Sequence, residues 1–175
     1  MKLAVLGGNT TIGASFVNRA TKHGFDVEQL LNYASFDKPK SKKINLTVGS
    51  YNNEINIVKC IRGSHAVICM SDFYNDINFD TMLNYVVDSG IKRLIIAETV
   101  QLDGKNLDNN LAKKLNKTQV DWTIVKYFEH GEHSALENTI INTKDFITSI
   151  QDSAKFIFNQ ITDSRYLQST VLIKN

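Results

Sequence analysis

The sequence is poor in the residues that mark several common protein classes. Its 175 residues include one proline and two cysteines, and Cys60 and Cys69 form neither a C-x-x-C pair nor a metal-binding pattern. Each cysteine lies in an apolar run, where a buried, reduced thiol is expected. The sequence also lacks internal repeats and linkers rich in glycine, proline or serine. We therefore expect a single domain over residues 1–175.

Long hydrophobic runs and an excess of one charge are missing as well. The apolar stretch after Met1 is too short for a membrane span or the core of a signal peptide, so we expect a cytoplasmic protein with no membrane partner. The formal net charge of +2 gives no electrostatic basis for binding nucleic acid. The basic run at residues 38–43 (KPKSKK) is typical of an exposed loop.

What the sequence does contain is a regular alternation of short apolar runs and amphipathic segments. The apolar runs predict strands that are buried on both faces, and the amphipathic segments predict helices. Strands are expected at residues 2–6, 25–31, 44–48, 66–70, 93–97, 122–126 and 170–173. Helices are expected at residues 12–22, 52–61, 79–89, 107–116 and 143–159, with Ile55, Val58 and Ile61 spaced for one face of the second. This alternation predicts an α/β fold: a Rossmann-like doubly wound, mostly parallel sheet with helices on both faces.

The first expected strand runs directly into a glycine-rich segment at residues 7–13 (GGNTTIG). A strand, a glycine turn and a helix form the phosphate-binding arrangement of dinucleotide folds. Gly7 permits the sharp reversal after the strand, and unpaired N–H groups in the first helical turn attract an anion. Gly13 lets the helix pack closely on the strand, while Asn9 and Thr10 offer side chains that cap the helix or contact phosphate. No Gly-Lys-Ser/Thr follows, which excludes a P-loop. A strand–helix turn that binds nothing is the alternative.

Four further stretches share a pattern with known proteins. They are residues 63–68 (GSHAVI), 89–96 (SGIKRLII), 121–126 (DWTIVK) and 152–156 (DSAKF). With the glycine segment, they resemble the motifs of the atypical short-chain dehydrogenase/reductases, and within that family the small NmrA-like NAD(P)-binding proteins. That group includes flavin and biliverdin reductases and redox-sensing regulators. The resemblance implies a Rossmann-like fold and a nicotinamide dinucleotide cofactor, NADP or NAD, with NADP favoured by the resemblance alone.

The resemblance also implies which residues border the cofactor. The pyrophosphate would lie at the glycine turn, and the rest of the cofactor and the acceptor along the carboxyl ends of the first, fourth, fifth and sixth strands. The residues assigned in this way are Gly7, Asn9, Thr10, Thr11, Ile12, Gly13, Asn32, Met70, Ser71, Thr99, Tyr127 and Phe128. No catalytic residue is assigned, and no metal ion is expected. The segment at residues 129–133 (EHGEH) is interpreted as a polar loop over the substrate mouth, with His130 or His133 as a candidate proton donor.

Several positions depart from the family's pattern. Thr10 stands where the second glycine is usual, and Thr11 where many NADP-binding members carry arginine. Asn32 follows the second strand in place of the acidic residue that selects NAD or the basic residue that selects NADP. Lysines 38, 40, 42 and 43 in the next loop are candidates for that selection. None of the six tyrosines has a lysine four residues later, so the usual acid–base pair is missing.

Two functions follow from these observations, and both stay open at this point. One is a small NAD(P)-binding oxidoreductase that reduces a flavin, a quinone or a similar flat acceptor. The other is a non-catalytic dinucleotide-sensing or protein-interaction regulator with a degenerate cofactor site. The strand–turn–helix favours the enzyme, while the missing tyrosine–lysine pair favours the regulator. The expected partners are a dinucleotide and a small aromatic acceptor, or a protein partner if the chain is a sensor.

Overall fold

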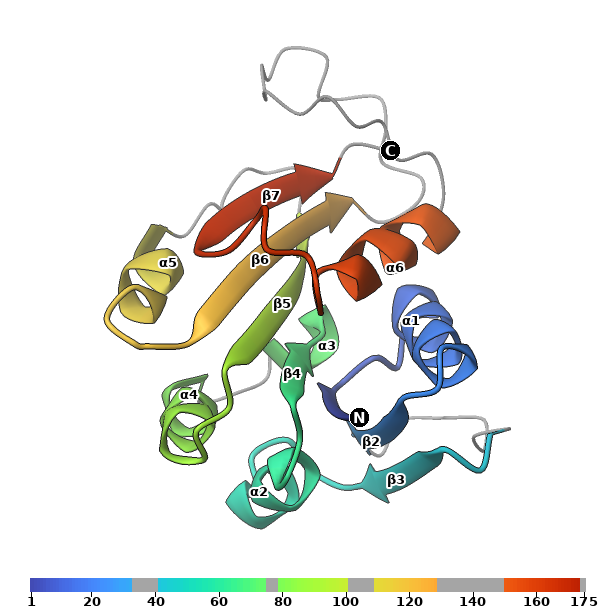
Figure 1. Ribbon diagram of the computed structural model, residues 1–175. Coiled ribbons are helices and arrows are strands. Elements are labelled where there is room, and N and C mark those ends of the chain that lie inside the picture. Colours follow the sequence, from blue (N-terminus) through green and yellow to red (C-terminus); the bar gives the residue numbers. More distant parts are fainter. Residues whose placement is uncertain (33–40, 75–78, 101–108, 129–149, 174–175) are drawn as a thin grey trace.

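Seven parallel strands form one sheet in the computed structural model of the chain (Figure 1). The structure describes residues 1–32, 41–74, 79–100, 109–128 and 150–173. The strands are β1 (Lys2–Leu6), β2 (Asp26–Leu31), β3 (Ile44–Val48), β4 (Ala66–Cys69), β5 (Arg93–Val100), β6 (Asp121–Phe128) and β7 (Ser169–Ile173). The helices are α1 (Thr11–Lys22), α2 (Glu54–Ile61), α3 (Ser71–Tyr74), α4 (Phe79–Asp88), α5 (Asn109–Leu115) and α6 (Ile150–Asn159).

The strand order places a change of direction beside β1. Across the sheet the order is β3-β2-β1-β4-β5-β6-β7, and every neighbouring pair is parallel. The chain therefore moves outward from β1 to β2 and β3, then returns to β4 on the other side of β1. Ligands in such sheets bind outside the carboxyl ends of the strands, where the connections diverge. The Rossmann-like doubly wound sheet expected from the sequence is confirmed.

Two hydrophobic cores cover the two faces of the sheet, because neighbouring residues of a strand point to opposite faces. In β1, Leu3 and Val5 belong to the core shared with α1 and α6, while Ala4 and Leu6 belong to the core shared with α2, α4 and α5. Figure 1 shows α1 and α6 together on one side of the sheet and α2 and α4 on the other. The prediction that helices cover both faces of the sheet is thus confirmed. Because the strands of the sheet are buried on both faces, their sequences are nearly continuous apolar runs.

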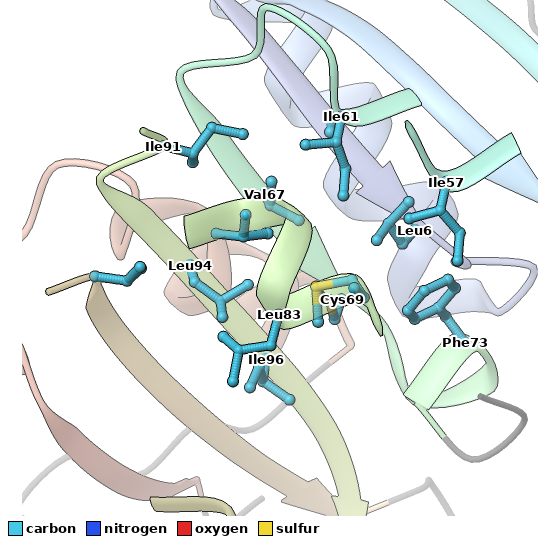
Figure 2. Packing of buried hydrophobic residues seen from close by; sticks show 14 of the residues in the cluster. Leu6, Ile57, Ile61, Val67, Cys69, Phe73, Leu83, Ile91, Leu94 and Ile96 are labelled. Carbon is cyan, nitrogen blue, oxygen red and sulfur yellow. Dashed lines mark hydrogen bonds between the residues drawn. The ribbon is translucent and has the colours of Figure 1, made fainter. Parts of the chain in front are cut away.

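The core on the α2, α4 and α5 face contains both cysteines and Trp122, which is 2% exposed. Figure 2 shows side chains from β1, β4, β5, α2, α3 and α4 meeting in this cluster. One expectation for this face is wrong: Ile55 is 74% exposed. The buried face of α2 is formed instead by Ile57, Cys60 and Ile61. Ile55 and Ile57 lie on different faces of the helix, so the sequence alone allows either face to be the buried one. The packing of α2 on β1 and β2 determines which face is buried.

The amino ends of β5 and β6 are joined to the end of α6 by one buried guanidinium. Arg93 donates from Nε to the carbonyl oxygen of Gln160 at 2.7 Å. Its Nη1 donates to the carbonyl oxygen of Asp121 at 3.1 Å, and its Nη2 donates to Oγ1 of Thr123 at 2.7 Å. Burial lowers the pKa of Arg93, and the nearby carboxylates of Asp121 and Asp163 oppose that shift. A buried cation needs such partners, because one left without them is strongly destabilising.

Element boundaries agree with expectation to within a few residues, with two differences. Strands β5 and β6 extend to Val100 and Phe128, beyond the predicted ends. The one-turn helix α3 was not predicted at all. The beginnings of the helices expected at 107–116 and 143–159 lie outside the described residues, and α5 and α6 form the rest. Among the residues that the structure describes, no helix is long and apolar enough to span a membrane.

The buried cysteines give a first testable prediction. Burial raises the pKa of the Cys60 thiol to about 12 and also raises the pKa of Cys69. Since the thiolate is the reactive form, neither thiol should react with an aromatic disulfide reagent at neutral pH while the protein is folded. Both should react after unfolding in guanidinium chloride. The measurement is release of the coloured thiol, and rapid release from the native protein would contradict the prediction.

Candidate functional site

The turn after β1 adopts backbone angles that favour glycine. Gly7 has φ +83° and Gly8 has φ +93°, a region that residues with a Cβ rarely adopt. The N–H of Gly7 donates to the carbonyl oxygen of Leu30 at 2.8 Å, and its own carbonyl oxygen accepts from Nε2 of Gln29 at 3.2 Å. The sharp reversal expected at Gly7 is confirmed. Gln29, a buried polar residue of β2 that fixes the turn, was not identified from the sequence.

Helix α1 begins immediately after this turn. Thr10 is its N-cap, with φ −127° and ψ 162°, and Oγ1 of Thr10 accepts from the N–H of Gly13 at 3.1 Å. A Cβ on Gly13 would overlap the backbone of Gly8, so the close packing expected at Gly13 is confirmed. The first intrahelical bond runs from the N–H of Ala14 to the carbonyl oxygen of Thr10 at 2.9 Å. The N–H groups of Thr11 and Ile12 precede it and therefore lie at the positive end of the helix dipole.

The carboxylate of Asp72, a residue of α3, contacts the turn at Gly8 and Asn9. Oδ1 of Asp72 accepts from the N–H of Gly8 at 2.7 Å, and Oδ2 accepts from the N–H of Asn9 at 3.1 Å. The hydroxyl of Tyr51 donates to the same Oδ2 at 3.0 Å. A Cβ on Gly7 would lie 2.6 Å from Oδ1, so the carboxylate fits closely against the glycine. No local pattern in the sequence indicated Asp72 for this position.

The residues after β4 send their side chains in different directions. Met70 is fully buried in the core under α1 and α6. Ser71, 5% exposed, and Tyr127, 1% exposed, bring their hydroxyl oxygens within 3.1 Å of each other. The sequence placed Ser71 at the middle of the cofactor and Tyr127 at the nicotinamide. The structure brings both residues together, as a buried contact between the carboxyl ends of β4 and β6.

Strand β5 ends beside β6 with polar residues on both faces of the sheet. Oγ1 of Thr99 is buried and has no hydrogen-bond partner within the described parts of the chain. Glu98, on the opposite face, forms an ion pair with Lys126 at 3.1 Å, and both side chains are less than a tenth exposed. Of these residues, only Thr99 was assigned to the site from the sequence. Its unsatisfied hydroxyl is a candidate contact for a polar ligand group.

The remaining residues assigned to the site from the sequence differ in their exposure. Asn9 and Thr11 are exposed, Ile12 packs in the core, and Asn32 is half-buried after β2. Phe128 ends β6, and the placement of its side chain lies outside the described residues, as does the whole segment at 129–133.

The expectation that nearby lysines could replace a basic selector at Asn32 is wrong for those that the structure describes. Lys42 and Lys43 precede β3, at the amino edge of the sheet, and Nζ of Lys43 donates to the carbonyl oxygen of Gly24 at 3.3 Å. A dinucleotide would bind at the opposite, carboxyl edge. Lysines 38 and 40 lie outside the described residues.

A groove of about 840 Å³ lies between α4 and α5, at the amino ends of β5 and β6. Lys92, Lys114 and Lys117 line it, and Lys114 pairs with Asp80 at 2.8 Å. It belongs to the edge of the sheet opposite the glycine turn. Because ligands of doubly wound sheets bind at the carboxyl edge, the groove is not part of the candidate site.

Comparison with known proteins defines the class of fold. No known protein-family model matches the chain, and no curated protein sequence matches it. Among solved structures, a Rossmann-fold NAD(P)-binding family protein from Shigella flexneri aligns with a TM-score of 0.74 at 15% identity, over 98% of this chain and 91% of that one. A short-chain dehydrogenase/reductase from Veillonella parvula, solved in complex with NADP, aligns with a TM-score of 0.71 at 13% identity, over 99% and 94%.

NmrA, a negative transcriptional regulator solved in complex with NAD, is a further structural neighbour. It aligns with a TM-score of 0.60 at 13% identity, over 72% of this chain and 44% of its own. These neighbours are NAD(P)-binding Rossmann proteins of the group that the sequence motifs resemble. At such identities the likeness shows the fold.

The glycine turn gives a second prediction. Gly13→Ala should lower the free energy of unfolding by about 3 kcal/mol or more, because its methyl group would overlap the backbone of Gly8. Gly90→Ala is the matched control: Gly90 has φ +67° and nothing lies within 4 Å of its added Cβ. The control should lose only about 1 to 2 kcal/mol, from the left-handed backbone. Chemical denaturation of both variants measures the difference, and equal losses would contradict the prediction.

Proposed function

We propose that the chain is a small NAD(P)-binding oxidoreductase that reduces a flat acceptor such as a flavin or a quinone, with the dinucleotide at the carboxyl edge of the sheet. The observation that carries this proposal is the start of α1. There the N–H groups of Thr11 and Ile12 precede the first intrahelical bond, directly after the glycine turn. Such a helix N-terminus binds phosphate well, because its donors and dipole both favour an anion. Solved neighbours of the same fold hold NADP or NAD, which supports a nicotinamide dinucleotide.

The chain's residues fit this cofactor at some positions better than at others. The α1 terminus offers donors for the pyrophosphate. Oγ1 of Thr99, which has no hydrogen-bond partner among the described residues, offers a polar contact at the end of β5. The bound dinucleotide would supply hydride. In this proposal the protein binds and orients the cofactor, and no side chain of the described residues is assigned as a proton donor. Asp72 is the residue that opposes the fit, because its carboxylate lies where a phosphate would be attracted.

A regulator that binds dinucleotide without turnover is the second candidate. It is favoured by the buried contact between Ser71 and Tyr127, which occupies the region assigned to the nicotinamide and the middle of the cofactor. The two candidates share the binding step and differ in turnover. Steady oxidation of NADPH or NADH by the purified protein with a flavin or quinone acceptor would support the reductase. Binding without oxidation would support the regulator, with a protein as its partner.

Removal of one backbone donor tests the binding step. Proline is well accepted at the first position of a helix, and the extended backbone of Thr10 suits a residue before proline. Thr11→Pro therefore removes the N–H of Thr11 with little effect on α1. We expect the wild-type protein to bind a dinucleotide with Kd between about 1 µM and 1 mM, or about 8 to 4 kcal/mol. Thr11→Pro should weaken this binding about tenfold, as expected for a lost bond to a charged acceptor.

Thr11→Ala is the matched control, since it keeps the N–H and removes only the hydroxyl and methyl groups of the side chain. Titration calorimetry with NADPH, NADP, NADH and NAD measures all three proteins, and thermal unfolding verifies that each variant is folded. Equal affinities for the proline variant and the wild type would place the pyrophosphate away from α1. No binding of any of the four dinucleotides by the wild type would overturn the proposed function.

A further inference from the structure

The glycine turn already holds an anion that belongs to the chain itself. The carboxylate of Asp72 accepts three hydrogen bonds: two from the successive N–H groups of Gly8 and Asn9, and one from the hydroxyl of Tyr51. Successive backbone N–H groups in a turn of this kind form an anion-binding concavity. Gly7 has no side chain, and a Cβ there would lie 2.6 Å from Oδ1 of Asp72. The turn is therefore shaped around this carboxylate.

We propose that Asp72 is a specificity-determining residue: its carboxylate competes with the pyrophosphate of a dinucleotide for the N–H groups of Gly8 and Asn9. The inference rests on the proposed binding of a dinucleotide at this edge of the sheet. In the wild-type protein the phosphates of the ligand bind only at the start of α1, because the carboxylate at the turn repels additional negative charge. A ligand that places less negative charge over the turn therefore binds more tightly than one that places more.

Two physical effects act in the same direction. A ligand phosphate that takes over the N–H groups of Gly8 and Asn9 must displace a charged acceptor, and hydrogen bonds to charged acceptors are about twice as strong as neutral ones. A phosphate that binds beside the carboxylate without displacing it is repelled by a like charge in a partly desolvated site. Tyr51 strengthens the first effect, because its ring is buried against Phe73 at 5.2 Å between centroids and holds the hydroxyl on Oδ2.

The closing experiment compares Asp72→Ala with the wild type. We expect Asp72→Ala to bind the best dinucleotide of the wild-type protein at least about tenfold more tightly. Asp88→Ala is the control for net charge, since Asp88 is an exposed aspartate at the end of α4 and its removal should change the affinity less than about twofold. Tyr51→Phe keeps the ring and removes one hydrogen bond to Asp72, so it should tighten binding about threefold. Calorimetry measures the affinities, and thermal unfolding verifies the folded state.

A second measurement uses inorganic pyrophosphate as the probe and backbone amide NMR as the readout. In Asp72→Ala, pyrophosphate should shift the Gly8 and Asn9 resonances at concentrations at least about tenfold lower than in the wild type. Equal or weaker dinucleotide binding by Asp72→Ala, or equal pyrophosphate midpoints, would overturn the inference. If no protein binds a dinucleotide but the pyrophosphate midpoints differ, the proposed function fails while the role of Asp72 stands. Should Asp72→Ala fail to fold, Tyr51→Phe decides, and an unchanged affinity in that variant overturns the inference.

Discussion

The close approach of Gly13 to Gly8 is the constraint on which the candidate site depends. Because neither residue has a side chain, α1 can begin immediately after the turn, with Thr10 as its cap. This brings the N–H groups of Thr11 and Ile12, which precede the first intrahelical bond, to the carboxyl edge of β1. There, beside β4, the order of the sheet changes direction. A side chain at Gly13 would push the helix away from Gly8, and the N–H groups of Thr11 and Ile12 would move with it.

Helix α3 determines how the rest of that edge is occupied. Its first three residues point to three different partners: Ser71 to the Tyr127 hydroxyl, Asp72 to the glycine turn, and Phe73 to the core beneath α2. A single turn of helix therefore couples the glycine turn, the end of β6 and one hydrophobic core.

The sequence predicted the fold well because the signals for it are local. Apolar runs in β1, β4 and β5 and the helical spacing in α1 and α4 each lie within about ten residues. The site was predicted less well because its contacts are not local: Gly8 and Asp72 are 64 residues apart, and Ser71 and Tyr127 are 56 apart. A helix of four residues is too short to show a 3.6-residue period. The family resemblance indicated the carboxyl edge of the sheet as the site, but it contained no information about a carboxylate particular to this chain.

The two edges of the sheet differ in how they hold their charges, and that difference bears on function. At the amino edge Arg93 is buried and bonded to three acceptors, so breaking its contacts would leave a buried cation without partners. At the carboxyl edge the Asp72 carboxylate is only partly buried, and water or a ligand can replace its backbone donors. Contacts at the amino edge are therefore harder to break than those of Asp72 at the carboxyl edge. If Asp72 competes with the ligand for the turn, binding is weaker, and weaker binding mostly means faster dissociation. Fast dissociation would suit both a reductase that releases its oxidised cofactor and a sensor that follows the cofactor's concentration.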